Sequence, residues 1–266
     1  MNNAIDMNEL QPVARPLLPV FFVLDTSGSM TGQPISILNH TMEETISILT
    51  NFAASNADAV MKIGLLEFSS GVKWMQPKGL EELGDFEYNK LTAGGLTDLG
   101  AALNELDGKL SRKAFLASTT GGCMPIIIFM TDGQPTDNWM EALTNINKNN
   151  KWYKNAIKIG FAVGPQANAS VISEIVGNSE AVIQTDNFEI FSKMLQKIAV
   201  NSAMIGSKSR TPDQTPSGAD IVKTTIEELG EENEVKTASD AGITVNSSAN
   251  TSTKDNPDPW GSDDWV

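Results

Sequence analysis

The sequence has one cysteine, one histidine and few basic residues among 266 positions. The lone Cys123 excludes an internal disulfide framework and a cysteine-built zinc site, and the lone His40 excludes metal sites built from several histidines. With 19 Lys and Arg against 33 Asp and Glu, the net charge is −14. We therefore expect no basic patch to neutralise phosphates, and neither nucleic acid nor an anionic membrane surface as a partner.

Long hydrophobic runs are also missing. Residues 1–13 are polar and carry no Lys or Arg, and the apolar block Leu17–Leu24 is interrupted by Pro19. This block is far shorter than the roughly 18–20 residues of a transmembrane helix. We expect a cytoplasmic protein without an export signal. Hydrophobic residues make up 40% of the chain, which is enough for one substantial core.

Two apolar runs end abruptly in an acid. Residues 17–25 read as a buried strand, and Asp25 is followed by Ser27 and Ser29. Residues 125–130 read as another buried strand, which ends in Thr131-Asp132-Gly133. In an open parallel sheet the carboxyl ends of the strands form the edge where ligands bind. Both acids are expected at that edge.

Strands and helices alternate along the rest of the chain. Tight spacing makes residues 59–68 and 72–75 an antiparallel hairpin. We predict a doubly wound, mostly parallel α/β sheet of Rossmann-like character with one antiparallel edge strand. The other predicted strands cover 156–163 and 181–184, and the predicted helices cover 34–52, 99–110, 137–147, 166–176 and 188–206, with Thr97 or Asp98 capping the second helix.

The composition divides the chain into three parts. Residues 1–16 are predicted to be a flexible lead, 17–206 a folded domain, and 207–266 a disordered, low-complexity acidic tail. Tryptophan is enriched at interface hot spots, so the tip of the tail is a candidate partner-binding motif; the alternative is a solubilising tail with incidental aromatics. The motif residues are Trp260, Asp263, Asp264 and Trp265.

Oxygen-bearing side chains gather in three predicted loops. If the strands ending in Asp25 and Asp132 lie side by side, their carboxylates meet, and Thr97 enters from the loop that opens a helix. Such donors suit a hard cation such as Mg²⁺. The alternative for Asp25, Ser27 and Ser29 alone is a helix-capping turn.

These loops carry a resemblance to the von Willebrand factor A (vWA) family. Residues 25–29 match its D-x-S-x-S motif, and Gly94-Gly95-Leu96-Thr97 and Thr131-Asp132-Gly133 match its second and third metal-site motifs. The resemblance implies a metal-ion-dependent adhesion site (MIDAS) for Mg²⁺ or Mn²⁺. Ser27, Ser29 and Thr97 would supply hydroxyl ligands, and Asp25 and Asp132 would act directly or through water.

Within that family, residues 18–21, 32–35 and 131–139 look like the bacterial tellurium-resistance-associated, TerY-like group. This resemblance implies an intracellular, non-enzymatic partner-binding protein of bacterial stress or conflict systems. Its relatives are linked with a protein kinase and a PPM-type phosphatase.

Two classes of function use the same predicted site. In the first, a partner Asp or Glu completes the coordination of the metal, and no residue is catalytic. The alternative is a metal-dependent phosphohydrolase, but Ser27 stands where a haloacid-dehalogenase-type phosphatase has its second acid, and no Walker lysine follows a Gly-rich loop. A third hypothesis places Asp263 or Asp264 of the tail on the metal, in the same chain or a second copy.

Overall fold

The chain forms a sheet covered by helices on both faces. A computed structural model describes residues 14–231 apart from 133, 165, 166, 186 and 210. The strands are β1 (Leu17–Asp25), β2 (Val60–Ser69), β3 (Gly71–Trp74), β4 (Glu81–Glu82), β5 (Ile126–Thr131), β6 (Ile157–Val163) and β7 (Val182–Thr185). The helices are α1 (Gln33–Ser55), α2 (Leu99–Lys109), α3 (Trp139–Asn149), α4 (Lys151–Asn155), α5 (Ala169–Val176), α6 (Phe188–Gly206) and α7 (Gly218–Glu231), with short 3-10 turns η2 (Gly28–Met30), η3 (Ser179–Ala181) and η4 (Pro212–Gln214).

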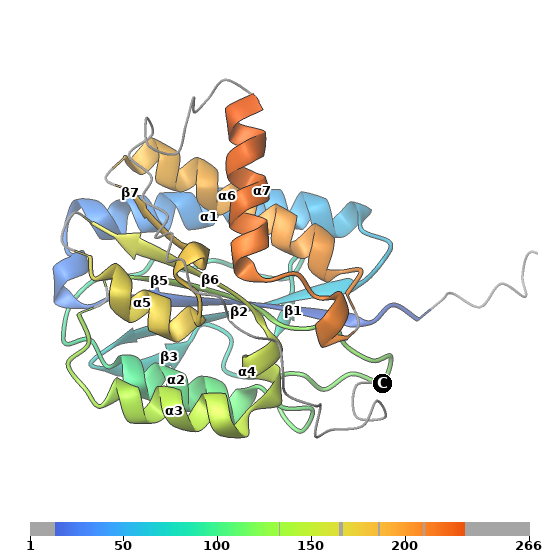
Figure 1. Ribbon diagram of the computed structural model, residues 1–266, viewed down its shortest axis with the longest axis horizontal. Helices are drawn as coiled ribbons and strands as arrows, with labels where there is room; N and C mark the ends of the chain where they lie inside the picture. Colours follow the sequence, from blue (N-terminus) through green and yellow to red (C-terminus); the bar gives the residue numbers. More distant parts are fainter. Residues whose placement is uncertain (1–13, 133, 165–166, 186, 210, 232–266) are drawn as a thin grey trace, which may run out of the picture.

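The sheet order is β3-β2-β1-β5-β6-β7 (Figure 1). Strand β1 pairs in parallel with β2 and β5, and the parallel pairing continues to β6 and β7. Strand β3 runs antiparallel to β2, as does the two-residue β4. The predicted doubly wound, mostly parallel sheet with an antiparallel edge strand is confirmed, and β4 is an addition that the sequence did not indicate.

The central strand is buried on both faces, which explains its unbroken apolar run. Phe22 and Leu24 join one core cluster, whereas Phe21 and Val23 point into the other. Helices α1, α6 and α7 contribute to the first cluster, and α2, α3, α4 and α5 to the second (Figure 1). Among the described residues, none of the helices combines the length and apolar character needed to cross a membrane.

The helix predicted at 137–147 is displaced. It begins at Trp139, and α4 follows after Asn150. The side-chain carbonyl of Asn150 accepts a hydrogen bond from the backbone N–H of Tyr153 at 3.0 Å, which starts α4. Periodicity did not indicate this break, because a single capping side chain decides it.

The folded part of the chain extends past residue 206, where we placed the end of the domain. Helix α7 buries Ile221, Val222 and Leu229 in the first core cluster. Asn201 of α6 donates a hydrogen bond to the hydroxyl of Thr225 at 3.0 Å. The domain therefore reaches at least residue 231, and the expected acidic tail shortens to residues 232–266, which lie outside the described residues, as do 1–13 of the lead.

Truncating a core side chain of α7 tests this boundary. We expect Ile221→Ala to lower the free energy of unfolding of the full chain by about 2–5 kcal/mol, because it leaves a cavity in the shared core. Urea denaturation measures the change. The exposed neighbour Lys223→Ala is the control and should shift stability by less than about 0.5 kcal/mol. Equal midpoints for both variants would place α7 outside the cooperative fold.

Candidate metal centre

The end of β1 turns sharply through Asp25, Ser27 and Ser29. The backbone N–H of Ser27 donates to Oδ1 of Asp25 at 2.8 Å, and the 3-10 turn η2 brings the hydroxyls of Ser27 and Ser29 to 3.0 Å from each other. Asp25 and Ser27 are buried, whereas Ser29 is exposed. The three oxygen-bearing side chains therefore form a short wall that opens to solvent at Ser29.

The end of β5 lies against this wall. The register pairs Leu24 with Met130, so Thr131 sits beside Asp25, and its hydroxyl donates to Oδ2 of Asp25 at 2.6 Å. Asp132 follows, and its Oδ1 accepts a hydrogen bond from the backbone of Gln134 at 3.1 Å. Burial raises the pKa of Asp25 and the nearby charge of Asp132 raises it further, while hydrogen bonds from Ser27 and Thr131 oppose the rise. The two carboxylates are thus close enough to repel each other.

The loop that carries Thr97 connects the loop after β1 with the loop after β5. Its Gly94 N–H donates to the carbonyl of Thr26 at 2.8 Å, and its Gly95 carbonyl accepts from the N–H of Gly28 at 3.0 Å. On the other side, Thr97 and Thr136 exchange two hydrogen bonds of 2.9 and 3.0 Å. Thr97 is itself buried. Its position between the β1 and β5 loops is therefore fixed from both sides.

A glycine is required in this loop. Gly95 has φ +86°, and a Cβ at this position would lie 2.7 Å from the hydroxyl oxygen of Ser70. Both the left-handed backbone and the close approach disfavour any other residue. The Gly-Gly pair of the motif thus brings the chain close enough to Ser70 and Gly28 to present Thr97.

The capping of α2 differs from the prediction that Thr97 or Asp98 caps it. Neither side chain bonds to the helix; Asp137 of the β5–α3 loop accepts from the N–H groups of Gly100 and Ala101, both at 2.9 Å. Asp98 instead accepts from the N–H of Gly71 at 2.7 Å and ties the loop to the β2–β3 turn. A side chain from a distant loop thus satisfies the helix start, and sequence spacing carries no signal for it.

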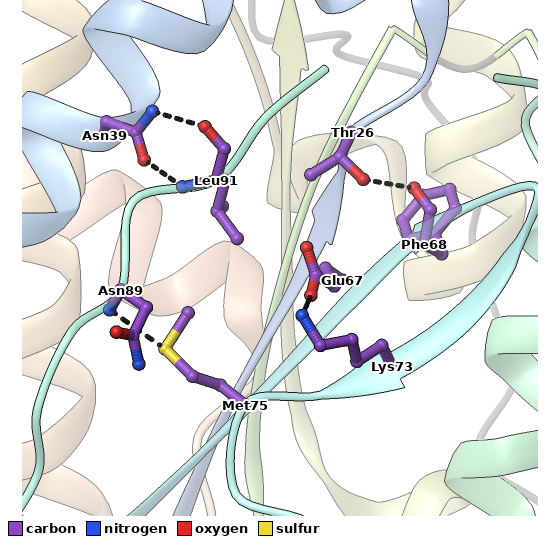
Figure 2. Close-up of polar contacts among 8 residues, drawn as sticks. All are labelled: Thr26, Asn39, Glu67, Phe68, Lys73, Met75, Asn89 and Leu91. Carbon is purple, nitrogen blue, oxygen red and sulfur yellow. Dashed lines mark hydrogen bonds and ion pairs between the residues drawn. The ribbon is translucent and has the colours of Figure 1, made fainter. Parts of the chain in front are cut away.

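The approach to the Thr97 loop is held by α1. Asn39 donates to the carbonyl of Leu91 at 2.9 Å and accepts from its N–H at 2.7 Å, so one amide side chain satisfies both backbone groups (Figure 2). The hydroxyl of Tyr88 also donates to Asn39, at 2.8 Å. Figure 2 also shows the sulfur of Met75 accepting from the N–H of Asn89. The segment leading to Thr97 is therefore anchored before it reaches the site.

Hydrogen bonds also fix the β1 loop to the neighbouring strand β2. The hydroxyl of Thr26 donates to the carbonyl of Phe68 at 3.2 Å (Figure 2). The N–H of Thr26 donates to the same carbonyl at 2.9 Å. The carboxylate of Glu67 accepts a hydrogen bond from Lys73 of the adjacent strand at 2.7 Å (Figure 2). The β1 loop is thereby fixed to the end of β2, and Glu67 is occupied in the hairpin.

Comparison with known proteins agrees with this geometry. Residues 20–134, which include all three loops as far as Asp132, match the model of the von Willebrand factor type A domain. This stretch of the chain is therefore similar to a vWA domain. A search of curated proteins gave no significant match.

Two solved structures share the fold. Proximal thread matrix protein 1 from the mussel byssus, solved with a zinc-occupied MIDAS motif, is 17% identical with a TM-score of 0.51, over 71% of this chain and 46% of that one. The pilus adhesin SpaC from Lactobacillus rhamnosus GG, in an open conformation, is 12% identical with a TM-score of 0.52, over 71% and 30%. The chain therefore spans less than half of each structure.

The residues of this site fit a divalent cation. Asp25 and Asp132 supply two negative charges in a buried setting where they repel each other, and Ser27, Ser29 and Thr97 lie in the three loops that meet there. A cation bound there would offset the burial and repulsion that raise the pKa of Asp25. Within the described residues, no group of three or more His, Cys, Asp or Glu forms a metal site, so the hydroxyls are needed to complete the donor set.

All five predicted ligand residues lie in these connected loops. The tail residues Trp260, Asp263, Asp264 and Trp265 lie outside the described residues. Sequence reasoning missed the supporting residues Thr131, Thr136 and Asp137, and also Asn39. Thr131 stood in a quoted motif and Thr136 and Asp137 followed closely, but their roles depend on which loops touch. Asn39 carried no signal.

The Asn39 anchor makes a testable prediction. Asn39→Ala leaves both backbone groups of Leu91 without this partner, and we expect the free energy of unfolding to fall by about 1–3 kcal/mol. Amide hydrogen exchange at Gly94 should accelerate more than at β6. Asn39→Asp keeps the acceptor for the Leu91 N–H and loses the donor, so its effect should be smaller. Unchanged exchange at Gly94 in Asn39→Ala would show that the anchor does not hold the Thr97 loop.

Proposed function

We propose that this domain is a metal-dependent protein-interaction module. The observation that carries the proposal is the meeting of Asp25, Ser27, Ser29, Thr97 and Asp132 at one edge of the sheet, held by hydrogen bonds between their loops. In the proposed site the three hydroxyls bind Mg²⁺ or Mn²⁺, and the carboxylates bind it directly or through water. The zinc-occupied MIDAS motif of the mussel protein supports a divalent cation here.

The donor set favours capture of a partner carboxylate. Two carboxylates balance the charge of a divalent cation, and neutral hydroxyls leave it electrophilic. The metal would supply a positive charge with an open coordination position, which an Asp or Glu of the partner fills. Beside Thr97, the side chain of Leu96 is 57% exposed and is therefore accessible to a partner bound at the metal.

The proposed setting follows from the TerY-like resemblance. We place the module in the cytoplasm of a bacterium, in a tellurium-resistance, stress-response or conflict system. A protein kinase and a PPM-type phosphatase are the proposed partners. The resemblance of residues 18–21, 32–35 and 131–139 supports this setting.

Metal binding should stabilise the folded chain. At a free Mg²⁺ or Mn²⁺ concentration about 100 times Kd, linkage adds about 2.7 kcal/mol, which raises Tm by roughly 5–11 °C. Differential scanning calorimetry of the full chain measures this shift. Ser27→Ala with Ser29→Ala should remove it, whereas Ser55→Ala with Ser111→Ala, at the opposite edge, should retain it. An equal shift in both double variants would mean that the metal binds elsewhere.

Partner capture should depend on the same site. The immobilised full chain should retain its bacterial partner in Mg²⁺ and release it when a chelator is added, and Ser27→Ala with Ser29→Ala should retain none. Mass spectrometry of the released protein tests the kinase and phosphatase assignment. Capture that survives the chelator unchanged would refute the mechanism.

The enzyme alternative has its own signature. Metal-dependent hydrolysis of p-nitrophenyl phosphate by the full chain that disappears in Asp25→Ala would favour a phosphohydrolase over a binding module. We propose that the domain is not an enzyme, because its one histidine, His40, lies exposed on α1, and its one cysteine, Cys123, is buried.

A further inference from the structure

A groove lies at the sheet edge opposite to the candidate metal centre. It consists of two hollows of about 690 and 430 Å³ that share Leu17, Lys62 and Ala117. Leu17 is the first residue of β1 and Asp25 the last, so the nine-residue strand separates the two edges by roughly 26 Å. The loop at Gly121 and Cys123 is hydrogen-bonded to Leu17, which fixes one wall of the groove.

The charged side chains that line this basic groove are all positive. Six basic side chains line the two hollows, and none of the lining residues is acidic. In a chain with a net charge of −14 this is a strong segregation of charge. Our premise that the protein has no basic patch was therefore wrong. The six residues are Arg15, Lys62, Lys78, Lys109, Arg112 and Lys113.

Only part of this charge is balanced nearby. The Nζ of Lys62 lies 3.5 Å from Oε1 of Glu82, and the Nζ of Lys109 lies 3.6 Å from Oε1 of Glu105. Within the described residues, exposed Lys78 and Lys113 form no ion pair. The groove therefore offers uncompensated positive charge to an acidic ligand.

The walls also offer apolar and hydroxyl groups. Leu80 and Phe115 are half-buried in one hollow, and the exposed hydroxyls of Ser118, Thr119 and Thr120 line the other. This combination suits an extended peptide that carries both carboxylates and aromatic side chains.

We propose that the basic groove binds the acidic C-terminal segment of the same chain, residues 232–266. This segment contains seven acidic residues (Glu232, Glu234, Asp240, Asp255, Asp258, Asp263 and Asp264) and two basic ones (Lys236 and Lys254). Its last residues combine carboxylates with Trp260 and Trp265, which matches the charged and apolar lining. The N-terminal segment, residues 1–13, is a poorer match, because it has only two acidic residues, Asp6 and Glu9, and no tryptophan.

Because the segment is covalently joined to α7, weak contacts are sufficient to hold it in the basic groove. Helix α7 ends at Glu231, and a flexible linker as long as the 35 residues beyond it would span roughly 30–35 Å. Such a linker keeps the segment at an effective concentration near the millimolar range. A nucleic acid has no such advantage, and the net charge of −14 repels it at long range. The segment is thus the favoured occupant.

A spin label on the segment tests the proposal in the full chain. Ser262→Cys carries the label, because Cys123 is 1% exposed and protected from it. Amide NMR signals of Lys78, Lys113 and Ala117 should lose at least half their intensity relative to the reduced label. The loss should disappear in 1 M NaCl, where the Debye length is about 3 Å.

Matched charge reversals locate the contact. Lys78→Glu with Lys113→Glu should abolish the intensity loss at Ala117. Lys148→Glu with Lys223→Glu changes the net charge equally, on exposed lysines outside the groove, and should preserve it.

Four results would overturn the proposal. The first is no intensity loss in the groove. The second is loss centred on Gly28, Leu96 and Gln134, which would place the segment at the metal centre. The third is loss seen only between labelled and unlabelled copies, which would assign the groove to a second chain. The fourth is binding of a thymidine 20-mer in the groove without displacement of the segment.

Discussion

The in-register parallel pairing of β1 with β5 is the constraint on which the rest of the structure depends. It places Asp25 and Asp132 at one edge of the sheet, where burial and mutual repulsion disfavour two ionised carboxylates. Hydrogen bonds from Ser27 and Thr131 oppose that cost without removing it. The loop of Thr97 then closes over the pair through backbone bonds to Thr26 and Gly28. Each of these features makes the edge a better host for a cation than for two bare acids.

The sequence was informative where burial forces a pattern. A parallel strand covered on both faces has to be apolar along its length, so an acid that ends such a strand stands out. Asp25 and Asp132 were found in this way, and Thr97 was found by its glycine-rich loop. The hydrogen bonds that hold the loops together were not predictable, because Asp137 caps a helix that begins 38 residues earlier, at Leu99, and Asn39 anchors a segment 52 residues away. Such pairings depend on the tertiary structure rather than on spacing.

Helix α7 shows how average composition can place the end of a folded domain too early in the sequence. Residues 207–266 average to a polar, acidic stretch, and this average outweighed the loose helical spacing of the few apolar positions at 219–229. Ile221, Val222 and Leu229 pack in the core cluster to which α6 also contributes, and Asn201 gives Thr225 a buried partner. Net charge misled in the same way. A chain with 33 acids and 19 bases can still gather six of those bases around one groove.

Charge is thus separated along the axis of β1, with carboxylates at its carboxyl end and basic side chains at its amino end. Strand β1 is fully buried and packed on both faces, so it holds the two edges at a fixed separation. Direct electrostatic coupling over roughly 26 Å is weak, because the Debye length at physiological ionic strength is about 8 Å. The two edges are therefore electrostatically separate surfaces. A segment held in the basic groove leaves the carboxylate edge open to a partner, whereas the same segment held at the metal centre would compete with that partner directly.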